Sequence, residues 1–207
     1  LEIDDNRIGV SGHSMGGMGI TRIYSWLTDE FAYFIPQASG LEEKLHTEQY
    51  LNKTFNVPYV HLQGKNDHFR SFITRCESQL KLTKELEVSY GVPSKLEVNF
   101  YNGDHNYNLP LFKSTLSRLM KNPRDLYQKE LFGSFDITNR KVVDNNITFH
   151  LNSEARYFWL ELASVDETVN DRLHFRAKIT ANTINIDMPV MPKASKELKV
   201  YLHSNMV

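Results

Sequence analysis

Short apolar runs alternate with longer amphipathic runs over the first 123 residues, a pattern typical of a parallel sheet with helices on its faces. The predicted strands are residues 7–10, 31–35, 57–63 and 96–101. Helices are predicted after residue 14, over residues 69–90 and from residue 108 to Pro123. Gly91 and Pro93 end the second helix, because glycine readily adopts the left-handed conformation at a helix end and proline cannot continue a helix. This part of the chain is predicted to be an α/β domain.

The pattern changes after Pro123. A short helix is predicted over residues 125–132, and from about Phe135 onward apolar and polar residues alternate strictly. Such runs with a period of two are separated by polar turns and predict an antiparallel β meander. We therefore divide the chain into an α/β domain, residues 1–123, and a small β-rich module, residues 124–207.

The chain carries almost no net charge. Its 207 residues include 24 basic and 25 acidic side chains, so nothing points to nucleic acid or an anionic membrane surface as a partner. No apolar run is long enough to cross a bilayer. The single cysteine, Cys76, excludes an internal disulfide. This composition agrees with a soluble enzyme.

The most informative segment joins the first predicted strand to the helix that follows it. Gly12-His-Ser-Met-Gly16 fits the pattern G-x-S-x-G, in which a serine occupies a sharp turn between a strand and a helix. Ser14 would stand at the apex of that turn. Gly12 and Gly16 are expected to lack side chains because the strand and the helix pass close together there. The motif predicts a serine nucleophile.

A serine nucleophile needs a base, and the base needs an acid that orients it. The strand 57–63 runs into Gly64-Lys-Asn-Asp67, and the strand 96–101 runs into Asn102-Gly-Asp-His105. Catalytic groups of open α/β sheets collect at the carboxyl ends of the strands. Since all three segments follow predicted strands, Ser14, Asp67 and His105 are expected to meet at one edge of the sheet.

These three motifs, in this order, resemble those of the α/β-hydrolases. Residues 3 to about 121 are similar to the C-terminal half of the catalytic domain of the esterase, feruloyl-esterase-like and polyhydroxybutyrate-depolymerase-like branch, and of related serine peptidases. The Met15 N–H, which opens the predicted helix at the positive end of its dipole, is expected to donate to an oxyanion. The resemblance implies that Ser14 is the nucleophile, Asp67 the acid and His105 the general base. It implies no metal and no cofactor.

The interpretation that follows is a serine hydrolase that cleaves a carboxylic ester, either in a small molecule or linked to a polymer, through an acyl-enzyme. Two alternatives stay open. A peptidase of the same fold would use the same triad, and a non-catalytic binding module could keep the fold without the activity.

The chain begins at the predicted nucleophile strand, whereas the resemblance implies several strands before it. We therefore interpret the α/β domain as lacking its N-terminal strands and the β-rich module as truncated. The strand edge beside residues 7–10 is expected to be exposed, and to associate with another chain or with a severed N-terminal half. An isolated chain would then be nearly inactive. No signal peptide is recognisable, and a secreted or periplasmic location is compatible with the sequence.

Five other reactive side chains have simpler interpretations. His13 is expected to shape the site rather than transfer protons, and His61 to be a core histidine inside a buried strand. His68 follows the predicted acid and is the best substitute for His105 as base. Asp104 is a weaker candidate than Asp67 for the acid, because adjacent residues rarely orient each other's side chains. Cys76 lies on an apolar helix stripe and is expected to be a buried structural thiol.

Overall fold

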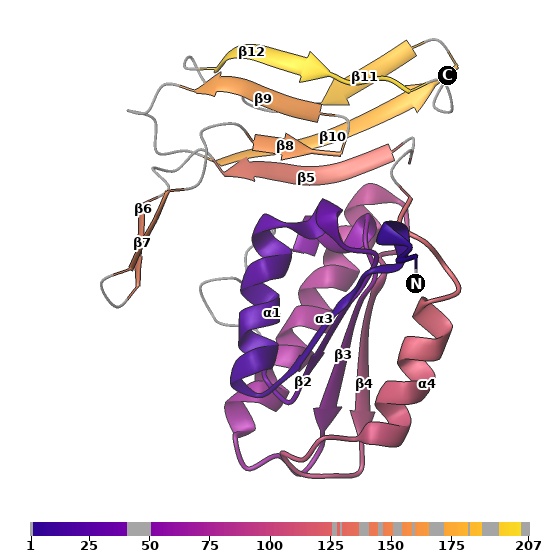
Figure 1. The fold of residues 1–207 in the computed structure, drawn as a ribbon, viewed down its shortest axis with the longest axis vertical. Coiled ribbons are helices and arrows are strands. Elements are labelled where there is room, and N and C mark those ends of the chain that lie inside the picture. The colour runs from indigo at the N-terminus through magenta and orange to yellow at the C-terminus, as the bar shows by residue number, and fades with distance from the viewer. Residues whose placement is uncertain are drawn as a thin grey trace. The chain divides into compact units, whose positions relative to one another are not determined.

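The computed structural model describes residues 2–40, 51–125, 128, 130–136, 141–144, 147–150, 155–158, 160–165, 172–181, 183–187 and 195–203. The chain forms two compact units, Leu1–Asp125 and Leu126–Val207 (Figure 1). The sequence pattern had placed the boundary after Pro123. The α/β unit and the β unit are described separately below.

The α/β unit contains a parallel sheet of four strands in the order β1-β2-β3-β4. Its strands are β1 (Val10–His13), β2 (Phe34–Gln37), β3 (Tyr59–Gly64) and β4 (Leu96–Tyr101). The described residues of this unit form the helices α1 (Met15–Trp26), α3 (Arg70–Tyr90) and α4 (Leu109–Leu119), with short 3-10 turns at Asp5–Arg7, Thr28–Glu30 and Lys53–Phe55. The predicted α/β class with a parallel sheet and flanking helices is confirmed.

The two faces of β3 show how the helices are layered. Val60 and Leu62 point to one face, where they join an apolar cluster with Leu119 of α4. On the opposite face, the Tyr59 ring packs against Tyr24 of α1, with 4.9 Å between ring centroids. β3 is buried on both faces, so helices cover both sides of the sheet. Figure 1 shows α4 on one side of the strands and α1 and α3 on the other.

Local signals set the ends of the two longer helices. Gly91 adopts the left-handed conformation, with φ 69°, and its N–H donates to the Glu87 carbonyl, which ends α3 where predicted. The side chain of Asn108 accepts a hydrogen bond from the Leu111 N–H at 3.0 Å and caps the start of α4. Strong capping residues thus make these boundaries readable from the sequence.

Strand β2 begins and ends later than the sequence pattern predicted, at Phe34–Gln37 instead of residues 31–35. The sequence pattern ended this strand before Pro36, yet β2 runs through Pro36 to Gln37. On one side β2 pairs with β1 at all four positions, whereas the pairs with β3 are Phe34 with Tyr59 and Gln37 with Leu62, on either side of the proline. Proline has no N–H to donate, so the strand tolerates it where the ladder to one neighbour is interrupted.

The β unit is antiparallel throughout its described strands. One sheet has the order β11-β10-β5, formed by Thr183–Asp187, Arg172–Thr180 and Glu130–Asp136. A second has the order β12-β9-β8, formed by Ser195–Val200, Leu160–Val165 and Ala155–Tyr157. In a third sheet, β6 (Lys141–Asp144) pairs antiparallel with β7 (Ile147–His150). The predicted small antiparallel module is confirmed.

Two details of that prediction were wrong. Residues 130–132, expected to be helical, form the start of β5, where Glu130 lies opposite Lys178 and accepts hydrogen bonds from Arg176 at 2.7 and 2.9 Å. The sheet is also not a simple meander, because β5 pairs with the distant β10. Cross-strand partners far along the chain decided both points, and a local pattern does not contain them.

β1 is an edge strand of the parallel sheet, since among the residues that the structure describes it pairs with β2 alone. Association through this edge stays a prediction. Among the same residues, no helix is both long and apolar enough to span a membrane.

Helix α1 packs closely on the sheet at Gly17 and offers a test of that packing. A Cβ atom at Gly17 would lie 2.6 Å from Ser39 Oγ and 2.8 Å from the Gln37 carbonyl oxygen, whereas one at Gly19 would meet no atom of the described residues within 4 Å. We expect Gly17→Ala to lower the free energy of unfolding by about 1–3 kcal/mol through overpacking. Gly19→Ala, the matched control, should raise it by about 0.5–1 kcal/mol because alanine favours a helix more than glycine does. Denaturant titration measures both changes, and equal effects would contradict the close packing at Gly17.

Candidate active site

Ser14 occupies a strained turn between β1 and α1. Its backbone has φ 54° and ψ −117°, values that a residue with a side chain rarely adopts. The turn is held because the Ser14 N–H donates to the Gln37 carbonyl at 2.9 Å and the Ser14 carbonyl accepts from the Met18 N–H at 3.0 Å. The sharp strand-to-helix turn predicted from G-x-S-x-G is present.

The glycines around this turn differ from the prediction at one position. A Cβ atom at Gly12 would lie 2.7 Å from the Gly16 carbonyl carbon and oxygen, so the strand and the helix do approach closely there. A Cβ atom at Gly16 itself would meet nothing within 4 Å in the described part of the chain. On α1, the position that has no room for a side chain is Gly17, which faces Gln37 of β2.

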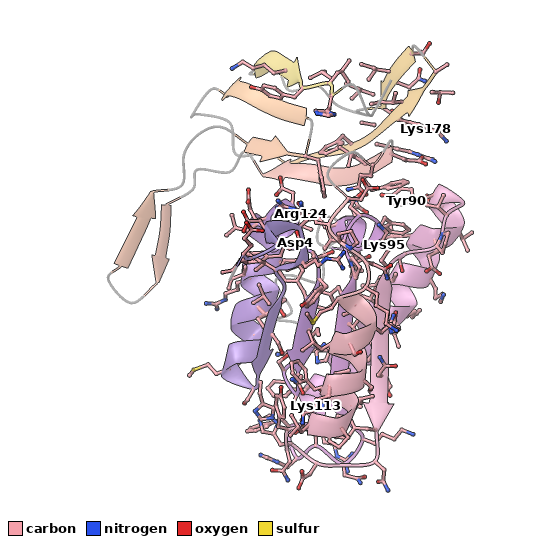
Figure 2. All side chains as sticks on the ribbon, turned by 45° about the vertical axis from the view of Figure 1, so that its right-hand side comes forward. Asp4, Tyr90, Lys95, Lys113, Arg124 and Lys178 are labelled. Atoms are coloured by element: carbon pink, nitrogen blue, oxygen red, sulfur yellow. The ribbon has the colours of Figure 1, made fainter. Side chains whose placement is uncertain are left out.

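The three residues predicted to meet do lie together at the carboxyl ends of their strands. The His105 Nε2 atom lies 2.7 Å from Ser14 Oγ, and its Nδ1 atom lies 2.9 Å from Asp67 Oδ2. Both β3 and β4 run toward the end of the α/β unit where Figure 2 labels Lys113, away from the end that carries Asp4, Lys95 and Arg124. The structure thus brings Ser14, Asp67 and His105 together at one edge of the sheet, where the sequence analysis expected them.

The partner atoms fix the protons of His105. An ionised carboxylate can only accept hydrogen bonds, so His105 Nδ1 carries the hydrogen that Asp67 receives. In the neutral imidazole, His105 Nε2 then carries no hydrogen and accepts the hydroxyl hydrogen of Ser14. This is the arrangement that a base needs before it removes a proton from a serine.

Asp67 is fully buried but is supplied with donors on both carboxylate oxygens. Its Oδ1 atom accepts from the Phe69 N–H at 2.9 Å, and its Oδ2 atom accepts from Gln63 Nε2 at 2.8 Å as well as from His105. Burial by itself raises the pKa of Asp67, but the hydrogen bonds from His105, Phe69 and Gln63 together hold its pKa below the ordinary value. The carboxylate is therefore ionised at neutral pH.

Backbone contacts hold two loops together. We call residues 64–69, which carry Asp67, the acid loop, and residues 102–107, which carry His105, the base loop. The Lys65 N–H donates to the Tyr101 carbonyl at 3.0 Å, and the Asn66 N–H donates to the Gly103 carbonyl at 2.8 Å. A Cβ atom at Gly64 would lie 2.1 Å from the Asp104 carbonyl oxygen, so only glycine fits between the loops. This spacing sets the distance between Asp67 and His105.

Asp104 takes no part in the contact with His105. Its Oδ1 atom accepts from the Asn106 N–H at 3.0 Å, a bond within its own turn. The structure therefore favours Asp67 over Asp104 as the acid, as the sequence did.

His13 contacts the base loop rather than the serine. Its Nε2 atom lies 2.7 Å from the His105 carbonyl oxygen, to which it donates, and its ring centroid lies 5.1 Å from that of His105. This bond ties β1 to the loop that carries His105. The expectation that His13 shapes the site agrees with this contact.

Side chains with apolar or aromatic surface surround His105 and Ser14. The Phe69 ring lies 4.9 Å from the His105 ring and is 46% exposed, and Tyr107 and Met15 are 42% and 79% exposed. His68, the substitute base in the sequence analysis, lies with its ring 5.2 Å from that of His105. The nitrogen that contacts Ser14 belongs to His105.

The first turn of α1 supplies a candidate oxyanion donor. Met15 is the first residue of the helix, and the first N–H groups of a helix have no carbonyl partner within it. The Ser14 N–H is already occupied by the Gln37 carbonyl. The Met15 N–H, next to the nucleophile and at the positive end of the helix dipole, remains suited to an anion.

The other two candidates are buried away from the serine. Burial lowers the pKa of His61 to about 4, and burial raises the pKa of the Cys76 thiol far above its usual range. Both are therefore uncharged at neutral pH, in agreement with the expected core histidine and inert thiol. Within the described ranges, no group of three or more His, Cys, Asp or Glu side chains is placed to hold a metal ion.

Sequence reasoning missed Gln63. The sequence pattern placed this residue only at the end of a strand. A polar glutamine is unusual in a fully buried strand, and this one precedes the predicted acid by four residues. That polarity was the available signal.

Comparisons with known proteins give similarity at the level of the fold. No protein-family model and no curated protein sequence matches the chain. A thermostable esterase is 19% identical with a TM-score of 0.45, over 59% of this chain and 32% of its own. S-formylglutathione hydrolase from Staphylococcus aureus is 19% identical with a TM-score of 0.37, over 58% and 53%. Acyl-protein thioesterase 2 from Zea mays is 13% identical with a TM-score of 0.43, over 58% of each chain.

The chain thus spans between 32% and 58% of the length of these three proteins. In the α/β unit itself, β1 of the parallel sheet leads into the strained turn at Ser14, and Asp67 and His105 follow β3 and β4 in that order. This arrangement is that of the α/β-hydrolase fold.

Proposed function

We propose that this chain carries the active site of a serine hydrolase that cleaves a carboxylic ester through an acyl-enzyme. The observation that supports the proposal most directly is the position of His105, which contacts Ser14 Oγ at 2.7 Å and Asp67 Oδ2 at 2.9 Å. A serine, a histidine and a carboxylate in these contacts form the constellation that activates a serine for acyl transfer.

In the first step, Ser14 Oγ attacks the ester carbonyl carbon while His105 Nε2 takes the hydroxyl proton. Asp67 accepts the hydrogen bond from His105 Nδ1 and stabilises the charged imidazolium that forms. The carbonyl oxygen becomes an oxyanion, to which the Met15 N–H donates. His105 then returns the proton to the alkoxide leaving group, and the acyl group stays on Ser14.

In the second step, water attacks the acyl-enzyme. His105 takes a proton from the water, and the second tetrahedral intermediate collapses with the proton returned to Ser14 Oγ. The products are a carboxylic acid, an alcohol and the regenerated enzyme. No metal or cofactor takes part in these steps. The exposed surface of Phe69, Tyr107 and Met15 favours an ester with an apolar group next to the carbonyl.

A fluorophosphonate probe tests the proposal, because it reacts with an activated serine and not with an ordinary one. We expect the full natural protein to be labelled at Ser14, as identified by peptide mass spectrometry, and Ser14→Ala to remain unlabelled. A protein that keeps its fold and its unlabelled Ser14 after prolonged incubation would instead be the binding module.

Ester and amide substrates separate the esterase from the peptidase. We expect p-nitrophenyl acyl esters of increasing chain length to be hydrolysed with a much higher kcat/KM than peptide p-nitroanilides. Both reactions would use Ser14, the residue that the fluorophosphonate labels. Anilide turnover equal to or above ester turnover would assign the site to a peptidase.

A further inference from the structure

Strand β3 directs two polar side chains into the interior of the α/β unit. His61 and Gln63 are both fully buried, and they share the face of β3 that also contacts Cys76 of α3. The other face of the strand carries Val60 and Leu62 in an apolar cluster. A buried amide without partners destabilises a fold by about 1–3 kcal/mol, so the contacts of Gln63 need an explanation.

The two ends of the Gln63 amide have different partners. Its Nε2 atom donates to Asp67 Oδ2 at 2.8 Å and lies 3.3 Å from the Gly64 carbonyl oxygen. At the other end, the amide oxygen faces the Cys76 thiol at 4.0 Å. The orientation is fixed chemically, because an amide oxygen 2.8 Å from a carboxylate oxygen would repel it.

The groups behind Gln63 carry no charge at neutral pH. Burial lowers the pKa of His61 to about 4, so its imidazole is neutral. Burial also raises the pKa of the Cys76 thiol, whose sulfur lies 3.7 Å from both His61 ring nitrogens. Asp67 is therefore the only charged member of the buried series His61, Gln63, Asp67.

We propose that Gln63 is a positioning residue, which holds the Asp67 carboxylate in the orientation that His105 requires. Asp67 Oδ2 accepts from both Gln63 and His105, and Oδ1 accepts from the Phe69 N–H. Without the Gln63 donor, the carboxylate keeps one fixed backbone donor and can turn away from His105. This role rests on the proposed function of the triad, since it concerns the same site.

Two substitutions at Gln63 test different parts of the contact. Gln63→Met keeps a similar side-chain volume and removes the hydrogen-bond donor. Because a hydrogen bond to a charged group is lost, we expect kcat to fall about tenfold or more, with KM near that of the parent. Gln79→Met is the matched control. Gln79 is also fully buried, its amide atoms have no hydrogen-bond partner in the described structure, and its kinetics should stay unchanged.

Gln63→Glu gives a signature that a purely structural role would not produce. The new carboxyl group would lie beside Asp67, and two adjacent carboxylates cannot both ionise easily, so Glu at this position holds a proton and donates as glutamine does. As the pH rises this group loses its proton and repels Asp67. We expect a rate near that of the parent at low pH and a descending alkaline limb in the profile of kcat/KM that the parent lacks.

Other titratable groups near the triad are the same in every variant, so they cancel in the comparison. They come from β1, the acid loop, β4 and the base loop, and they are His13, His68, Tyr101, Asp104 and Tyr107.

The full natural protein is used for all assays, with circular dichroism and thermal melting to check each variant. Parent-like kcat in a folded Gln63→Met, an equal loss in Gln79→Met, or a Gln63→Glu profile that matches the parent would each overturn the role of Gln63. If Gln63→Met does not fold, the near-isosteric Gln63→Glu decides the matter alone. A parent protein that neither hydrolyses esters nor reacts with fluorophosphonate would overturn the proposed function instead.

Discussion

Ser14→Ala and His105→Ala are each expected to remove nearly all ester hydrolysis, with kcat lower by about 10³–10⁶-fold. The reason is that His105 Nε2 lies 2.7 Å from Ser14 Oγ. In the proposed mechanism, Ser14 needs this base to become a nucleophile, and the base has no proton to accept without Ser14. For the same reason, the double variant should be little slower than either single variant. Initial rates on a p-nitrophenyl ester, in the full natural protein, measure all three.

Ser11→Ala is the matched control for this experiment. Ser11 lies on β1, the strand that precedes Ser14, and its hydroxyl donates to the Ile35 carbonyl at 3.0 Å rather than contacting His105. Its removal should leave kcat within a fewfold of the parent. Substantial turnover in Ser14→Ala would refute nucleophilic catalysis by Ser14, and a multiplied loss in the double variant would show that the two residues act independently.

Asp67→Asn should lower kcat by about 10³–10⁴-fold while the protein stays folded, as the corresponding change does in serine proteases. The carboxylate accepts three hydrogen bonds, from His105, Gln63 and the Phe69 N–H. An asparagine oxygen cannot serve all three donors, and its NH₂ group facing His105 Nδ1 would favour the tautomer that carries hydrogen on Nε2. That tautomer cannot accept the Ser14 proton.

Asp104→Asn separates the two acids that the sequence offered. Asp104 bonds to the Asn106 N–H, and an asparagine oxygen can accept that bond equally well. We therefore expect kcat within a fewfold of the parent. A loss in Asp104→Asn as large as that in Asp67→Asn would mean that the acid had been assigned to the wrong residue.

The sequence predicted the α/β unit well where local chemistry is strong. The end of α3 at Gly91 and the start of α4 at Asn108 both follow from capping residues whose effect stays within one helical turn. The β unit was harder, because Glu130 belongs to a strand only through its partners on β10. A short segment of mixed propensity takes the structure that its distant neighbours provide.

By itself, the sequence determined the serine turn, the order of Ser14, Asp67 and His105 along the chain, and their placement after strands. These are properties of short segments, since a strand-to-helix turn and a strand end are set by residues next to one another. Only the tertiary structure decided that Gly17 rather than Gly16 must lack a side chain, that His13 bonds to the His105 carbonyl, and that Gln63 donates to Asp67. His13 and His105 are 92 residues apart. Gln63 is close to Asp67 in sequence, but its side chain lies between the Asp67 carboxylate and Cys76 of α3, and contacts of this kind are absent from any local pattern.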